Sequence, residues 1–121
     1  MYRLAPTEGQ DANELLVIDV SDDGGVRVLR LDGELDMAGV PHFESSLLGN
    51  RPPGTATFVL DLRELTFIDS SGIRALIMAD KSVRDGGGRL IVVRGSQRVD
   101  QVLEMTGVAR QIEVVDEPPV A

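Results

Sequence analysis

The segment Phe67-Ile68-Asp69-Ser70-Ser71-Gly72-Ile73-Arg74-Ala75-Leu76 passes from an apolar strand into an amphipathic helix. Ser and Asp are favoured at a helix N-terminus because their oxygens accept hydrogen bonds from the unpaired first amides, and Gly leaves room for close approach. The segment therefore predicts a strand, a tight turn and a helix that starts beside Asp69, Ser70 and Ser71. A serine hydroxyl held at the surface in this way suits a kinase or a docking partner, so we expect a regulatory switch here.

Strand and helix patterns alternate on both sides of this segment. Residues 15–20 and 26–31 are rich in Val, Ile and Leu, and Ser21-Asp22-Asp23-Gly24-Gly25 between them predicts a β-hairpin. The apolar periodicity then predicts helices at about 39–48, 71–84 and 97–105 and strands at 57–62, 89–93 and 112–115. This order predicts one α/β domain, with a mixed, mostly parallel sheet that opens with a hairpin and packs against about three helices.

The composition agrees with a single small domain. The chain has 121 residues, of which 42% are apolar and 3% are aromatic, so one core built from Val, Leu, Ile and Ala is expected and a second domain has no room. We predict a folded domain at residues 14–115, with disordered tails at 1–13 and 116–121.

Charge and cysteine content narrow the classes of function. There are 20 acidic and 12 basic residues, and a formal charge of −8 repels nucleic acid and anionic lipid surfaces. No cysteine is present, which excludes disulfides and thiolate metal sites and agrees with a reducing compartment. The N-terminus has no apolar run of the kind that a signal peptide or membrane span needs. We expect a cytoplasmic protein without nucleic acid or membrane partners.

Three stretches of sequence resemble the STAS domain, specifically that of bacterial anti-sigma factor antagonists. The run from Phe58 to Leu76 resembles the family signature, Leu31-Asp32-Gly33-Glu34-Leu35-Asp36 precedes it, and Val102-Leu103-Glu104-Met105-Thr106-Gly107-Val108 follows it. Their order and spacing are similar to the family over roughly positions 15 to 115. The resemblance implies a STAS-type domain in which the first serine of Asp-Ser-Ser-Gly, here Ser70, is phosphorylated.

The resemblance also implies a function. The unphosphorylated protein would bind an anti-sigma factor that has serine kinase activity and so release a sigma factor, and phosphorylation of Ser70 would end the binding. A serine phosphatase would restore the first state. The chain itself would perform no catalysis and hold no cofactor, and we expect a monomer or a weak dimer. Asp69 would hold Ser70 and contact the partner, Ser71 would shape the turn and share the cap, and Gly72 would allow close approach.

Two further groups of residues are candidates for the partner surface. Arg74 and Met78 follow Ser70 at helical spacing, on the side opposite the core stripe of their helix. The resemblance places Asp32, Glu34 and Asp36 in a loop near the phosphorylated serine. The plainer alternatives are a solvated helix face, a solvated acidic turn, and a pair of residues at 69 and 70 that only cap the helix.

Three kinds of chemistry fit the sequence less well. A serine hydrolase elbow needs Gly-x-Ser-x-Gly, but residue 68 is Ile, and the only histidine, His42, sits beside a proline at a helix start. A phosphate receiver that uses Asp61 would need an acidic pair after its first strand and a lysine after its last, whereas Lys81 lies in a helix. Without cysteine, and with no Asp-x-Asp-x-Asp-Gly loop, no metal site is expected.

The main rival is a STAS domain that does not switch, such as an adaptor subunit of a transporter or of a signalling assembly. Such an adaptor would bind equally well with Ser70 changed to Ala or Asp. The chain also departs from the family pattern at its end. Many of these antagonists have a further helix there, but Asp116-Glu117-Pro118-Pro119 ends regular structure just after the last strand.

Overall fold

Five strands form one sheet whose spatial order follows the chain. The structure is a computed structural model that describes residues 15–119. Its elements are β1 (Leu16–Asp23), β2 (Val26–Leu35), α1 (Val40–Leu48), β3 (Thr57–Ile68), α2 (Ser70–Asp85), β4 (Arg89–Val93), α3 (Gln97–Met105), α4 (Val108–Gln111) and β5 (Glu113–Val115). The strand order is β1-β2-β3-β4-β5, with β1 antiparallel to β2 and all other neighbours parallel. The predicted mixed sheet that opens with a hairpin is confirmed.

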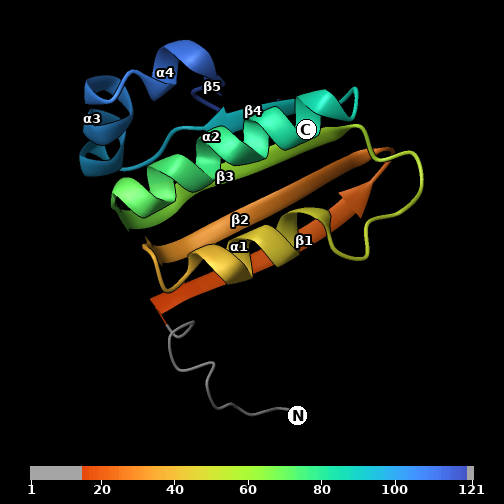
Figure 1. Ribbon diagram of the computed structural model, residues 1–121, viewed down its shortest axis with the longest axis horizontal. Coiled ribbons are helices and arrows are strands. Elements are labelled where there is room, and N and C mark those ends of the chain that lie inside the picture. Colours follow the sequence, from red (N-terminus) through yellow and green to blue (C-terminus); the bar gives the residue numbers. More distant parts are fainter. Residues whose placement is uncertain (1–14, 120–121) are drawn as a thin grey trace.

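The described helices all pack on one face of the sheet. Each parallel crossover moves one strand further in the same direction, and right-handed crossovers in one direction place their helices on the same side. Figure 1 shows α1 and α2 side by side across that face, with α3 and α4 beyond α2. Among residues 15–119 the other face carries no helix, and we call it the helix-free face.

Alternation along the strands divides their side chains between the two faces. In β3, Phe58, Leu60 and Leu62 point toward the helices and join the main core, whereas Val59 and Asp61 point to the helix-free face. Every helix contributes to the main core. Its larger buried members include Leu29, Leu31, Leu35, Phe43, Leu47, Leu65, Ile68, Ile73, Leu76, Leu90, Val92, Val99, Leu103 and Val108.

A buried arginine ties the hairpin to α1. The guanidinium of Arg27, only 3% exposed, donates from Nε and Nη2 to the two carboxylate oxygens of Asp22 at 2.8 and 3.0 Å. Its Nη1 donates to the carbonyl oxygens of Ser46 at 3.0 Å and Gly49 at 2.6 Å, which otherwise lack partners at the end of the helix. The hydrogen bond from Arg27 also lowers the pKa of Asp22. The cation is therefore paired and hydrogen-bonded, as burial requires.

Several predicted boundaries were wrong. Residues 32–35 were expected in a loop but form the end of β2, because β2 continues to pair with β3 through two register shifts as far as Leu35 and Ile68. The short helix α4 was not predicted, because its four residues are too few to show helical periodicity. The predicted N-terminal tail at 1–13 lies outside the described residues, as do residues 120–121 of the C-terminal tail. Residues 116–119 form neither helix nor strand.

Candidate functional site

The first turn of α2 presents Ser70 at the surface. Asp69 is the N-cap residue, with extended backbone, and its Oδ1 accepts a hydrogen bond from the amide of Gly72 at 3.0 Å. Ser70 is exposed, and its hydroxyl makes no hydrogen bond within residues 15–119. The expectation that Ser71 shares the cap was wrong, since the Asp69 carboxylate is the side chain that caps this helix. The hydroxyl of Ser70 is therefore available for other chemistry.

Gly72 sets how closely α2 approaches the sheet. A Cβ on this buried glycine would lie 2.4 Å from the carbonyl oxygen of Leu35 and 2.6 Å from Cγ1 of Ile68. These distances are far below van der Waals contact, so a side chain here would push the first turn of α2 away from β2 and β3. The close approach expected of Gly72 is thus made to this chain's own sheet.

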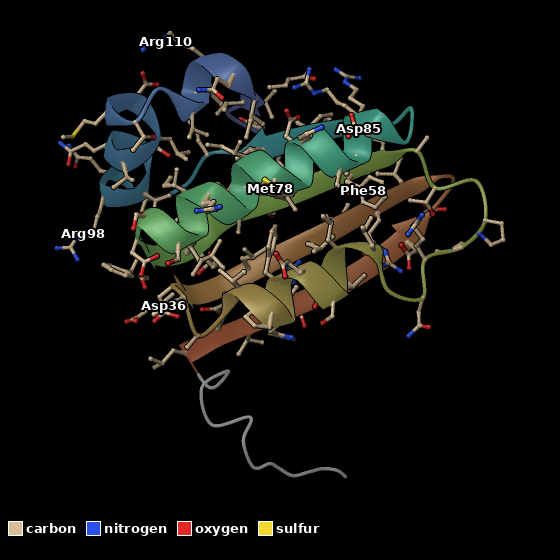
Figure 2. The ribbon with its side chains drawn as sticks, in the orientation of Figure 1. Asp36, Phe58, Met78, Asp85, Arg98 and Arg110 are labelled. Atoms are coloured by element: carbon tan, nitrogen blue, oxygen red, sulfur yellow. The ribbon has the colours of Figure 1, made fainter. Side chains whose placement is uncertain are left out.

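The ends of β2 and β3 bring Asp36 to the same corner of the molecule. The amide of Asp69 donates to the carbonyl oxygen of Leu35 at 3.4 Å, so the two strands end side by side. Oδ1 of Asp36 accepts a hydrogen bond from the amide of Gly39 at 3.1 Å, in the turn that leads into α1. Figure 2 shows Asp36 at the end of β2, near the starts of α1 and α2. Asp36 and Asp69 therefore both lie at the corner where β2 and β3 end.

Arg74 and Met78 lie in a groove between α1 and α2. Two adjacent hollows form it, of about 300 and 250 Å³, and both are lined by Glu44, Ala75 and Met78. The hollow of 300 Å³, nearer the start of α2, is also lined by Met37, Val40, Pro41, Ser71 and Arg74. We call these two hollows the α1–α2 groove. It links the Ser70 corner to a surface that includes exposed apolar atoms of Met37 and Met78, which are 74% and 52% exposed.

Asp32 and Glu34 lie on the other face of the sheet from the α1–α2 groove. Their register partners on β3 are Glu64 and Phe67, and alternation from the core residue Leu31 places both carboxylates on the helix-free face. The structure thus gathers Asp36, Asp69, Ser70, Ser71, Arg74 and Met78 around the start of α2. It separates Asp32 and Glu34 from the α1–α2 groove by the thickness of the sheet.

Met37 and Glu44 are exposed groove residues that sequence reasoning did not single out. Met37 lies in the turn before α1, where no periodic pattern predicts the direction of a side chain. Glu44 falls on the exposed side of α1, and the sequence did not show that this side faces α2. An exposed methionine next to an acidic turn was the one local signal that could have drawn attention to position 37.

The residues of the rejected alternatives have other surroundings. Asp61 is buried on the helix-free face, where its carboxylate accepts hydrogen bonds from Nε and Nη2 of Arg63 at 3.0 and 2.8 Å. Burial raises the pKa of Asp61, but the hydrogen bonds and charge of Arg63, with the charge of Arg30, lower it further, and the net direction is down. His42 is half-buried near the start of α1, and burial lowers its pKa.

Residues 15–119 contain no cluster of three or more His, Cys, Asp or Glu side chains that is suited to hold a metal ion. In the same range, every helix is too short or too polar to cross a lipid bilayer.

The fold and the corner around Ser70 define an α/β domain with a five-stranded mixed sheet and a serine at the exposed start of a helix. The STAS domain family matches residues 17–119, and the chain belongs to this family. A relative from Staphylococcus aureus (strain NCTC 8325 / PS 47), named anti-sigma-B factor antagonist, is 28% identical over 79 residues. The match covers 65% of this chain and 73% of that protein.

Solved structures have the same fold. The anti-sigma factor antagonist SpoIIAA of Bacillus, in its unphosphorylated form, is similar with a TM-score of 0.64 and 20% identity, over 84% of this chain and 90% of that one. A part of the murine anion transporter Slc26a9 is similar with a TM-score of 0.65 and 20% identity, over 78% of this chain and 16% of that one. At these identities the likeness shows the fold alone.

Proposed function

We propose that this chain is an anti-sigma factor antagonist that works by partner switching. In its unphosphorylated form it binds an anti-sigma factor with serine kinase activity, in the cytoplasm, and the sigma factor is released. The kinase then transfers the γ-phosphoryl group of ATP to the hydroxyl of Ser70, and the complex dissociates. A serine phosphatase removes the phosphate. The chain is a regulator and performs no catalysis of its own, and it acts as a monomer or a weak dimer.

One observation carries the proposal. The cap of α2 is made by Asp69, so the exposed hydroxyl of Ser70 is not needed to hold the helix. Helix capping explains Asp69 and close packing explains Gly72, but neither structural role requires the hydroxyl of Ser70. The name of the relative from S. aureus and the two forms of SpoIIAA, unphosphorylated and phosphorylated, support this assignment.

The partner would contact the corner around Ser70 and the α1–α2 groove. Met37 and Met78 offer adaptable apolar contacts, while Asp36, Asp69 and Glu44 add negative charge around them. A matching partner surface has apolar side chains within a basic rim. Asp32 and Glu34, on the opposite face, are reached only by a partner that also extends around the end of the sheet.

Phosphorylation of Ser70 supplies enough free energy for a switch. Converting a partner from 99% bound to 99% free takes about 5.5 kcal/mol of differential affinity. A phosphate adds about −1.5 to −2 charges beside Asp69 at pH 7, and burying even a neutral polar group without a partner costs about 2 to 7 kcal/mol. The free amides of the first turn of α2 stabilise the phosphate, so the modified domain remains folded.

The alternative function is the adaptor, since part of a transporter has the same fold. In that case the chain is an adaptor subunit of a transporter or signalling assembly, and Ser70 is an ordinary surface residue. If the chain is a switch, a negative charge at position 70 ends partner binding. If it is an adaptor, the same charge leaves binding unchanged.

A capture experiment separates them. Wild type, Ser70→Ala and Ser70→Asp are used as bait in a lysate of the source organism, and the captured proteins are identified by mass spectrometry. The switch predicts that wild type and Ser70→Ala retain a kinase-like anti-sigma factor and that Ser70→Asp loses it. Ser71→Asp, one residue further along α2, shows whether any acid at the helix start has the same effect. Capture of the same transporter or scaffold subunits by all the baits would replace the switch with the adaptor.

A further inference from the structure

The helix-free face contains a second group of buried apolar side chains. Val59, Ile91 and Val93 are 0%, 2% and 0% exposed, yet none of them belongs to the main core beneath the helices. Val59 and Ile91 are register partners on the neighbouring strands β3 and β4. A valine on an uncovered sheet face keeps part of its surface in water, so these side chains must lie under a cover.

The segment that follows β5 reaches this face. We call residues 116–119 the C-terminal strap. Pro118 lines a hollow of about 380 Å³ together with Val26, Val28, Arg30 and Asp61, all of which lie on the helix-free face. Two strand spacings of about 4.8 Å separate β5 from β3, and three extended residues span about 10 Å. The strap therefore leaves β5, crosses β4 and reaches β3 at Pro118.

Charged contacts accompany this path. Nε of Arg94 lies 3.0 Å from Oδ1 of Asp116, and because this nitrogen is buried and makes no hydrogen bond within residues 15–119, the pair is electrostatic. Arg63 also lines the hollow that contains Pro118. The hydrogen bonds and charge of Asp61 raise the pKa of Arg63, burial opposes this, and the charges of Glu64 and Glu117 add to the rise. Asp116 thus lies beside Arg94, and Pro118 lies in the same hollow as Arg63.

The chemistry of the strap fits a flat path over the sheet. Pro118 and Pro119 carry no backbone N–H, so the strap cannot continue as a further hydrogen-bonded strand beside β5. Extended proline-containing segments are also ordered at low cost, because their backbone angles are already restricted. An acidic segment that contains proline therefore matches the apolar floor of Val59 and Ile91 and the arginines beside it.

We propose that the helix-free face is a second interaction surface, shaped for an extended acidic segment that contains proline, and that the C-terminal strap of the same chain occupies it. This surface lies on the side of the sheet opposite Ser70 and the α1–α2 groove, and it does not depend on the proposed function. In this proposal the strap covers the helix-free face, on which no helix within residues 15–119 packs.

Thiol reactivity tests the proposal, since the chain has no cysteine of its own. Val59→Cys places one thiol under the strap. Val92→Cys is the matched control, because Val92 is 1% exposed but faces the main core on the other side of the sheet. Each variant is made in the full chain, with and without the pair Asp116→Asn and Glu117→Gln, and the rate of reaction with a soluble disulfide reagent is measured under native conditions.

In the unaltered strap we expect both thiols to react slowly. Neutralising the two acids should accelerate Val59→Cys about tenfold or more by local opening of the strap and leave Val92→Cys unchanged. Fast reaction of Val59→Cys with the unaltered strap would overturn the proposal, as would equal rates with and without the two neutralising substitutions. Acceleration of both thiols together would also overturn it, because the opening would then be global.

Discussion

Asp69 and Gly72 form the joint between β3 and α2: the carboxylate of Asp69 accepts the amide hydrogen of Gly72 at 3.0 Å, while the missing side chain of Gly72 lets the same turn rest against Leu35. One residue satisfies the helix start and the other allows it to approach the sheet. Together they hold Ser70 at the surface without using its hydroxyl.

Substitution of Gly72 tests this packing. Gly72→Ala should destabilise the fold by about 1 to 3 kcal/mol, because the new Cβ collides with a backbone carbonyl that has little freedom to move. Gly86→Ala is the matched control at the other end of α2, where a Cβ would meet nothing closer than 3.6 Å. Urea unfolding of both variants measures the difference. Equal stability of the two would show that the first turn of α2 adjusts freely.

Asp69 is expected to act through its hydrogen bond on stability and through its charge on binding. Asp69→Ala should lower the free energy of unfolding by about 1 kcal/mol, whereas Asp69→Asn should preserve most of the cap. Thermal unfolding gives the stability. Affinity for the captured partner then isolates the charge, since Asp69→Asn keeps the fold. Unchanged affinity in Asp69→Asn would remove the carboxylate from the proposed contact surface.

The exposed methionines should contribute to binding and not to folding. Met37→Ser and Met78→Ser each remove an apolar side chain from the α1–α2 groove, and we expect about a tenfold loss of affinity for the partner. Stability should change by about 0.5 kcal/mol or less, because both side chains are largely in water. Met105→Ser is the control, because Met105 is 85% exposed on α3. Equal losses at all three positions in titration calorimetry would argue against the groove as the docking surface.

Acid should destabilise the protein partly through Asp61. The pKa of this carboxyl is lowered in the folded protein from its usual value of 3.8, so the unfolded state binds the proton more readily. The stabilisation is present above about pH 4 and is lost as the pH falls through the lowered pKa of the folded state. Asp61→Asn should flatten the dependence of unfolding free energy on pH in this range.

Arg63→Gln provides the complementary test of Asp61. Without the guanidinium, burial is left to raise the pKa of Asp61, and the midpoint of acid unfolding should move to higher pH. Circular dichroism during an acid titration follows both variants. An unchanged profile in both would show that Asp61 does not contribute to the acid sensitivity.

The predictions from sequence succeeded where neighbouring residues decide the outcome. The hairpin, the helix after Asp69 and the exposed face of Arg74 and Met78 all follow from turn chemistry, capping and helical spacing within a few positions. The turn of the hairpin is shorter than predicted, because residues 21–23 belong to β1 and only Gly24 and Gly25 connect the strands. The α/β class and the STAS family were also predicted and are confirmed. The roles of the predicted site residues in binding and phosphorylation stay predictions.

Contacts between distant segments were decided only by the tertiary structure. Residues 32–35 form a strand because they pair with β3. This pairing places Asp32 and Glu34 on the face of the sheet opposite Ser70. Met37 joined the groove because α1 packs beside α2. Pro118 reaches the helix-free face beside Val28 and Asp61 because β5 ends two strands away from β3. Sequence by itself determined most of the helices and strands and the helix start that presents Ser70, because those depend on local backbone energies. The surfaces depend on register and packing between remote residues, which no local pattern records.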